Sequence, residues 1–98
     1  MGQIFEIDHT ASNHKGIFSI RVEGKRVAEL SYTVAGSDKI IIDHTEVSAI
    51  LRGTGAGLSL VQAAVNWARN MQYGVIPLCP FAKATILKHP ELQDVLLK

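Results

Sequence analysis

The chain has 98 residues, of which 47% are hydrophobic, so it is expected to form a single domain over residues 1–98 with a small core. Ten basic residues stand against nine acidic ones, and this balance argues against a general nucleic-acid or membrane-surface binder. With one cysteine and no evident secretory or membrane-spanning apolar run, we expect a cytoplasmic protein without an internal disulfide or a membrane partner.

The first half of the chain shows the alternation of apolar and polar residues that is typical of β-strands. Strands are predicted over residues 3–8, 18–22, 28–34 and 40–42. Turns are predicted over residues 10–16, 23–26 and 36–38, and such short connections favour antiparallel neighbours. Three consecutive isoleucines, Ile40 to Ile42, do not alternate, which predicts that this strand is covered on both faces.

The second half changes to a helical period. Between Leu58 and Met71 the polar residues fall on one narrow stripe, so most of this helix is expected to pack against the sheet. A short strand over residues 75–78 follows, and then a helix from Phe81 to Lys88 and a last turn from Glu91. The predicted fold class is mixed α/β, with four antiparallel strands, a helix, a fifth strand and C-terminal helices.

A glycine-rich segment, Arg52-Gly53-Thr54-Gly55-Ala56-Gly57, separates the fourth strand from the first helix. Such a turn brings bare backbone N–H groups together at the positive end of a helix dipole, an arrangement that favours bound phosphate. A nucleoside-triphosphate loop would need Lys followed by Ser or Thr after Gly57, where Leu58 and Ser59 stand. A dinucleotide loop would need a third glycine where Leu58 stands. The remaining alternative is that the glycines serve only a tight turn and close helix packing.

Four motifs in register extend over nearly the whole chain. They are His44-Thr45-x-Val47, the glycine loop, Pro77-Leu78-Cys79-Pro80-Phe81-Ala82 and Lys88-His89-Pro90-Glu91. Together they resemble the minimal single-domain members of the GCN5-related N-acetyltransferase superfamily. The resemblance implies a fold in which the fourth and fifth strands of a mixed sheet splay apart.

The resemblance also implies acetyl-CoA as co-substrate. The pantetheine arm would lie between the splayed strands and pair with the backbone near Thr45 and Val47, while the pyrophosphate would rest on the loop N–H groups. Lys83, one turn into the second helix, is within reach of the nucleotide phosphate or is merely solvated. The expected cofactor-binding residues are Thr45, Val47, Arg52, Gly53, Thr54, Gly55, Ala56, Gly57 and Lys83.

Cys79 is the candidate for the chemistry, because the resemblance places the thioester after the fifth strand. A thiolate there would accept the acetyl group, given a pKa lowered by a histidine or by the following helix N-terminus. His44, at the end of the neighbouring strand, is the candidate base or orienting partner. The alternatives are a small buried hydrophobe for Cys79 and a structural role for His44. No histidine or cysteine has the paired spacing of a metal site, so no metal is expected.

The leading functional interpretation is acetyl transfer from acetyl-CoA to an amine acceptor. Larger members of the superfamily carry helices between the first two strands, and here only residues 10–16 fill that gap. The acceptor pocket would therefore be completed by a second copy in a homodimer, or the acceptor would be an exposed amine of a small molecule or a protein lysine. The alternatives are an acyl-CoA-binding module without efficient turnover and a structural protein with a vestigial site.

Overall fold

The computed structural model describes residues 5–97, and four antiparallel strands come first in it, as the alternation predicts. They are β1 (Ile7–Ser12), β2 (Lys15–Val22), β3 (Lys25–Ala35) and β4 (Lys39–Val47). The turn between β2 and β3 consists of Glu23 and Gly24, both with positive φ, which suits the right-handed twist of a hairpin. The predicted turn over residues 36–38 is also confirmed.

The segment predicted as a turn over residues 10–16 is mostly strand, so that prediction was wrong. β1 continues through Ser12, pairs with Lys15 of β2, and leaves only Asn13 and His14 in the turn. The residues of this edge strand are mostly exposed, so their polarity reflects solvent contact rather than an irregular backbone. Residues 3 and 4 of the predicted first strand lie outside the described residues.

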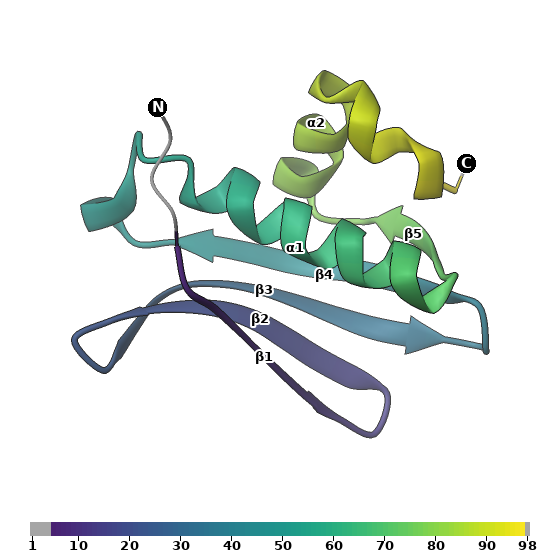
Figure 1. Ribbon diagram of the computed structural model, residues 1–98, viewed down its shortest axis with the longest axis horizontal. Helices are drawn as coiled ribbons and strands as arrows, with labels where there is room; N and C mark the ends of the chain where they lie inside the picture. Colours follow the sequence, from purple (N-terminus) through teal and green to yellow (C-terminus); the bar gives the residue numbers. More distant parts are fainter. Residues whose placement is uncertain (1–4, 98) are drawn as a thin grey trace.

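Both helices lie on one face of the sheet. They are α1 (Ala56–Met71) and α2 (Pro80–Lys88), and the strand β5 (Gly74–Pro77) lies between them in the sequence (Figure 1). Two 3₁₀ turns flank this region: η1 (Ala49–Leu51) precedes α1, and η2 (Pro90–Val95) follows α2. β5 pairs in parallel with β4, so the sheet order is β1-β2-β3-β4-β5. The predicted mixed α/β class and element order are therefore confirmed.

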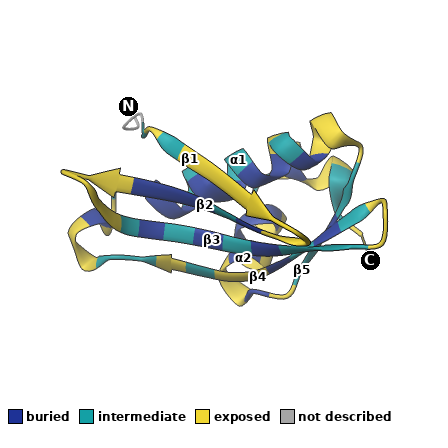
Figure 2. Ribbon diagram, turned by 90° about the horizontal axis from the view of Figure 1, so that it is seen from below, coloured by how far each residue is buried: buried dark blue, intermediate teal, exposed yellow. Residues whose placement is uncertain are grey.

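Within residues 5–97, no element covers the other face of the sheet, and Figure 2 looks onto it with β1 to β4 in front of the helices. Ile40 and Ile42 point to the helix side and are fully buried, whereas Ile41 is only half-buried. The predicted cover on both faces of this strand was therefore wrong. The core lies between sheet and helices, where α1 contributes Leu60, Val61, Ala64, Val65 and Ala68.

The C-terminal turn η2 is held against α1 by a bidentate ion pair. Arg69 of α1 donates from Nε to Asp94 Oδ2 at 2.7 Å and from Nη2 to Asp94 Oδ1 at 2.6 Å. Its Nη2 also donates to the carbonyl of Glu91. Arginine suits such a pair because its planar donors match a carboxylate. In the part of the chain that the structure describes, no helix is long and apolar enough to cross a membrane.

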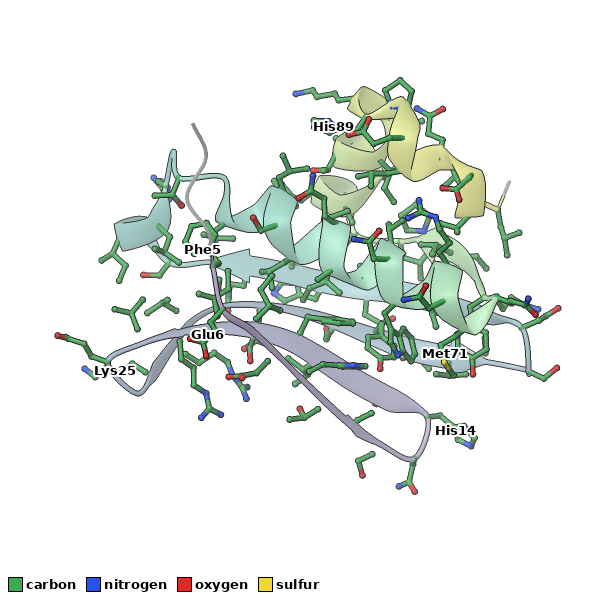
Figure 3. All side chains as sticks on the ribbon, viewed as in Figure 1. Phe5, Glu6, His14, Lys25, Met71 and His89 are labelled. Carbon is green, nitrogen blue, oxygen red and sulfur yellow. The ribbon has the colours of Figure 1, made fainter. Side chains whose placement is uncertain are left out.

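An aromatic cluster fills the space under the C-terminal half of α1. The imidazole of His9 stacks on Phe18 with ring centroids 4.0 Å apart, and its Nε2 is 2.6 Å from the hydroxyl of Tyr32. Trp67 of α1 contacts all three rings. This end of the molecule, marked by Met71 and His14 in Figure 3, is thus packed with side chains. The glycine loop is at the other end of α1.

Candidate functional site

The strands β4 and β5 are paired only along the first half of β4 and diverge beyond it. Their parallel pairing ends at Ile42 and Pro77, while β4 runs on to Val47 paired with β3 alone among the described strands. The carbonyl of Ile42 marks the fork, because it accepts hydrogen bonds from the N–H groups of both Leu78 and Cys79 at 3.1 Å. The strands β4 and β5 are therefore splayed as the family resemblance implies, and none of the described strands lies beside the outer edge of β4 beyond the fork.

A bulge at the same point decides which side chains face the fork. Tyr32 of β3 pairs with Ile42 and the preceding Ser31 pairs with His44, so Asp43 is an extra residue in β4. Strict alternation from Ile42 would turn His44 toward the helices. The bulge instead gives that direction to Thr45, which lies opposite the fully buried Leu30.

The glycine loop begins α1 with two residues in the left-handed region, Gly53 at φ 76° and Gly55 at φ 84°. Gly55 is the N-cap, and no side chain caps the helix there. The first N–H groups of α1 therefore lack intrahelical acceptors and point out of the helix end. Alternating left- and right-handed residues shape backbone N–H groups into an anion-binding concavity.

The loop forms one wall of a cavity of about 360 Å³. The opposite wall comes from one face of α2 and its end, Phe81, Thr85, Lys88 and His89, and Val47 and Leu58 complete the lining with Arg52, Gly53, Gly55 and Gly57. Sequence analysis did not assign these α2 residues to the site. Phe81, Thr85 and Lys88 are separated by four and then three residues, a spacing that places them on one face of a helix. Figure 3 shows His89 at the end of α2, away from the sheet turns marked by Lys25 and His14.

Cys79 is the N-cap of α2 and is buried, with 6% of its surface exposed. Burial raises the pKa of its thiol, but the nearby Thr45 hydroxyl and the backbone N–H groups of Ala82, Phe81 and Thr45 favour the thiolate and outweigh it, so the net pKa lies below the ordinary value, although the thiol makes no capping hydrogen bond to the helix. The Thr45 hydroxyl is itself buried and has no hydrogen-bond partner of full geometry among the described residues. The Cys79 sulfur is nevertheless near enough for this hydroxyl to lower the pKa of the thiol.

His44 is not brought to Cys79. Its side chain is 61% exposed, and its Nε2 lies 3.8 Å from the carboxylate of Glu46. Because of the bulge, it shares the uncovered face of the sheet with the residues opposite it on β3. The expected role of His44 as base or orienting partner of the thiol has no geometric support here.

Lys83 is also separated from the glycine loop. It borders a different cavity, of about 430 Å³, with Ile76, Pro77, Leu78, Leu87, Leu96 and Leu97. The structure does bring together Val47, Arg52, Gly53, Gly55 and Gly57 around one cavity, with Thr54 and Ala56 in the same loop and Thr45 beside Cys79.

A further hollow of about 330 Å³ lies at the end of β3 and β4, where Val47 also lines it. Glu29 and Glu46 stand directly opposite each other there on adjacent strands. Like charges in such a cross-strand pair are unfavourable by themselves. Arg26 is 3.7 Å from Glu29 and offsets part of the charge. Across residues 5–97, no three His, Cys, Asp or Glu side chains gather as metal ligands would.

Comparison with known proteins agrees with this geometry. Residues 17–95 match the profile of a family described as GCN5-related N-acetyl-transferase. The solution structure of a GCN5-like candidate N-acetyltransferase from Staphylococcus aureus is 36% identical, covers 92% of this chain and 87% of its own, and superposes with a TM-score of 0.72. No curated protein gives a significant match.

Two longer proteins share the fold at lower identity. The ribosomal-protein-alanine N-acetyltransferase from Brucella melitensis is 17% identical, with 80% of this chain and 62% of that chain covered and a TM-score of 0.66. A candidate streptothricin acetyltransferase from Bacillus anthracis, solved with acetyl coenzyme A, is 16% identical, with 67% and 39% covered and a TM-score of 0.57. The profile match and the 36% identical relative show that the chain belongs to the GCN5-related N-acetyltransferase family.

Proposed function

We propose that the protein is an acetyl-CoA-dependent N-acetyltransferase that passes the acetyl group through Cys79 to an amine. The observation that carries this proposal is the fork between β4 and β5, with the thiol at its base and the glycine loop on the neighbouring cavity. Family membership and a relative solved with acetyl coenzyme A support the choice of co-substrate.

The co-substrate would bind mainly through backbone groups. The loop N–H groups from Gly53 to Gly57 donate hydrogen bonds to the pyrophosphate, since the backbone already points them outward and the glycines have no side chain that would block its approach. The free edge of β4 near Thr45 and Val47 receives the pantetheine arm as an added strand would be received.

The chemistry follows from the state of the thiol. The Cys79 thiolate attacks the acetyl carbonyl, a new C–S bond forms, and the bond to the CoA sulfur breaks, so that CoA leaves and takes up a proton. The amine then attacks the acetyl-cysteine, forms the amide and loses a proton, and the Cys79 thiolate is restored. In the direct alternative the amine attacks acetyl-CoA itself, and Cys79 only packs beside the thioester.

The acceptor class follows from charge on the uncovered face. Glu29 and Glu46 crowd two carboxylates into a hollow that shares Val47 with the glycine-loop cavity. A cationic amine relieves their repulsion and is drawn to the site before it loses its proton. An amine of a small molecule or an exposed protein lysine meets this requirement.

The co-substrate assignment is tested with a matched pair of glycine variants. Gly55 at φ 84° and Gly24 at φ 81° both have open space where a Cβ would stand, so an aspartate strains the backbone equally, by about 1 kcal/mol. Gly55→Asp also puts a carboxylate against the pyrophosphate, which costs about 1–4 kcal/mol per charge pair at 4 Å. By calorimetric titration with CoA, Gly55→Asp should bind at least tenfold more weakly, and Gly24→Asp should bind like the parent. Equal binding by the two variants would refute the loop assignment.

The transfer route is tested by intact-mass analysis after incubation with acetyl-CoA. An added mass of about 42 Da, one acetyl group, is expected on the parent and absent in Cys79→Ser, because a serine hydroxyl is far less nucleophilic. On addition of an amine, the label should move to the amine. A Cys79→Ser variant that transfers at the parent rate would establish direct transfer, and CoA binding with no transfer to any amine would establish the binding module.

A further inference from the structure

The cavity beside the glycine loop is lined by two fixed cations and by no carboxylate. Arg52 belongs to the loop wall and Lys88 to the α2 wall, and His89 follows Lys88. Neither Arg52 nor Lys88 has an ion-pair partner among residues 5–97, whereas His89 Nδ1 lies 3.6 Å from Glu91. In a chain of net charge +1, this is a local concentration of uncompensated positive charge.

These cations exceed what the pyrophosphate needs. Backbone donors at the start of α1 are suited to the pyrophosphate without any side chain. Lys88 lines the cavity from α2, about two helical turns after Phe81, a residue that is 44% exposed and whose ring lies against Gly57. A cation so placed is positioned for a second anionic group on the same ligand.

CoA carries such a group, because its ribose bears a 3′-phosphate in addition to the pyrophosphate. A phosphate monoester holds nearly two negative charges at neutral pH and is bound best by Lys and Arg side chains. We propose that Lys88, with Arg52 across the cavity, binds the 3′-phosphate and makes the protein selective for CoA over its dephosphorylated form. The proposal rests on the proposed function, since it needs a CoA ligand in this cavity.

The same helix provides a matched control for Lys88. Lys88 is in the last turn of α2, where its positive charge interacts favourably with the helix dipole, so its replacement lowers the stability of the protein slightly. Lys83 is on the same helix but borders the leucine-lined cavity instead. Replacement of either lysine by glutamine removes one positive charge from α2, and only one of them faces the ligand.

The experiment compares the dissociation constants of CoA and 3′-dephospho-CoA by calorimetric titration at low ionic strength. The parent and Lys83→Gln should bind CoA about tenfold more tightly than dephospho-CoA, and added salt should narrow the gap. Lys88→Gln should reduce this ratio to about threefold or less, with Arg52 accounting for what remains, and its affinity for dephospho-CoA should be unchanged from that of the parent. Arg52→Gln should reduce the gap in the same sense.

The outcomes separate the two proposals. If neither the parent nor any variant binds either ligand, the proposed function fails. If the parent binds both ligands equally, the 3′-phosphate makes no useful contact and the inference is overturned while the function stands. If Lys88→Gln loses affinity for both ligands by the same factor, Lys88 contacts the pyrophosphate, which also overturns the inference.

Discussion

Replacement of Thr45 by valine should slow the reaction of Cys79 with alkylating agents without unfolding the protein. The two side chains have nearly the same shape, and the Thr45 hydroxyl is buried, has no hydrogen-bond partner of full geometry among the described residues, and lowers the pKa of the nearby Cys79 thiol. Its removal takes away a donor to the thiolate and leaves no new cavity. The free energy of unfolding should therefore stay the same or rise slightly.

The size of the effect follows from one hydrogen bond. A bond of about 1 kcal/mol to the thiolate changes the thiolate fraction about fivefold at a pH below the thiol pKa. The N–H groups of Phe81 and Ala82 still act on the sulfur in the variant, so some activation remains. Alkylation by iodoacetamide at neutral pH, followed by mass spectrometry, should be about fivefold slower in Thr45→Val. At high pH, where both thiols are ionised, the two rates should converge.

His44→Ala is the matching control, because the His44 side chain is mostly exposed and lies beside Glu46. This variant should alkylate at the parent rate across the pH range. The reasoning is refuted if His44→Ala slows alkylation while Thr45→Val does not. A rate difference for Thr45→Val that persists at high pH would show that access to the sulfur, rather than its ionisation, had changed.

Three further changes test the packing around the site and the core. Gly16→Ala puts a Cβ 2.2 Å from the hydroxyl of Tyr32, which is 1% exposed and bonded to His9, so we expect a loss of about 2–4 kcal/mol in urea unfolding; a loss under 1 kcal/mol would contradict the packing. Gly57→Ala meets the Phe81 ring at 2.5 Å, but that ring is partly exposed and can swing into the ligand cavity. In this variant the free energy of CoA binding, measured by titration, should therefore change more than the free energy of unfolding, measured by thermal melts of the same sample. Partial desolvation of the ring against Phe18 lowers the pKa of His9, although the residue is largely exposed, so the unfolded chain binds more protons and stability should drop as the pH falls through about 6.5. In His9→Phe that drop should be smaller, by urea unfolding at pH 7 and pH 5.

The local features of the fold were predictable because each has a signal within a few residues. The alternation along β2 and β3, the helical stripe of α1 and the glycine loop all follow from short-range patterns. The first strand was predicted to end at residue 8, whereas β1 continues through Ser12, because an exposed edge strand is as polar as a turn. Ile41 was placed in a covered position because a run of three isoleucines does not reveal that one of them faces outward.

The fine geometry of the site was not predictable for a different reason. One extra residue, Asp43, reverses the order of faces in β4, so that Thr45 and not His44 reaches the thiol. A bulge of one residue is set by pairing with a distant strand and leaves no local mark in the sequence. The choice between Lys83 and Lys88 is similar, because it depends on the rotation of α2 about its axis against α1.

The two-residue turn between β1 and β2 has a consequence for how the protein can discriminate among acceptors. Asn13 and His14 reverse the chain without any further element, and no part of the chain that the structure describes covers the outer surface of the sheet (Figure 2). An enclosed pocket sorts molecules by volume, and a bare sheet sets no upper limit on the size of what approaches it. If the chain transfers acetyl groups as we propose, its selection of acceptors must therefore rely on charge and on the reach of the reactive group into the fork, so that a bulky acceptor is admitted on the same terms as a small one.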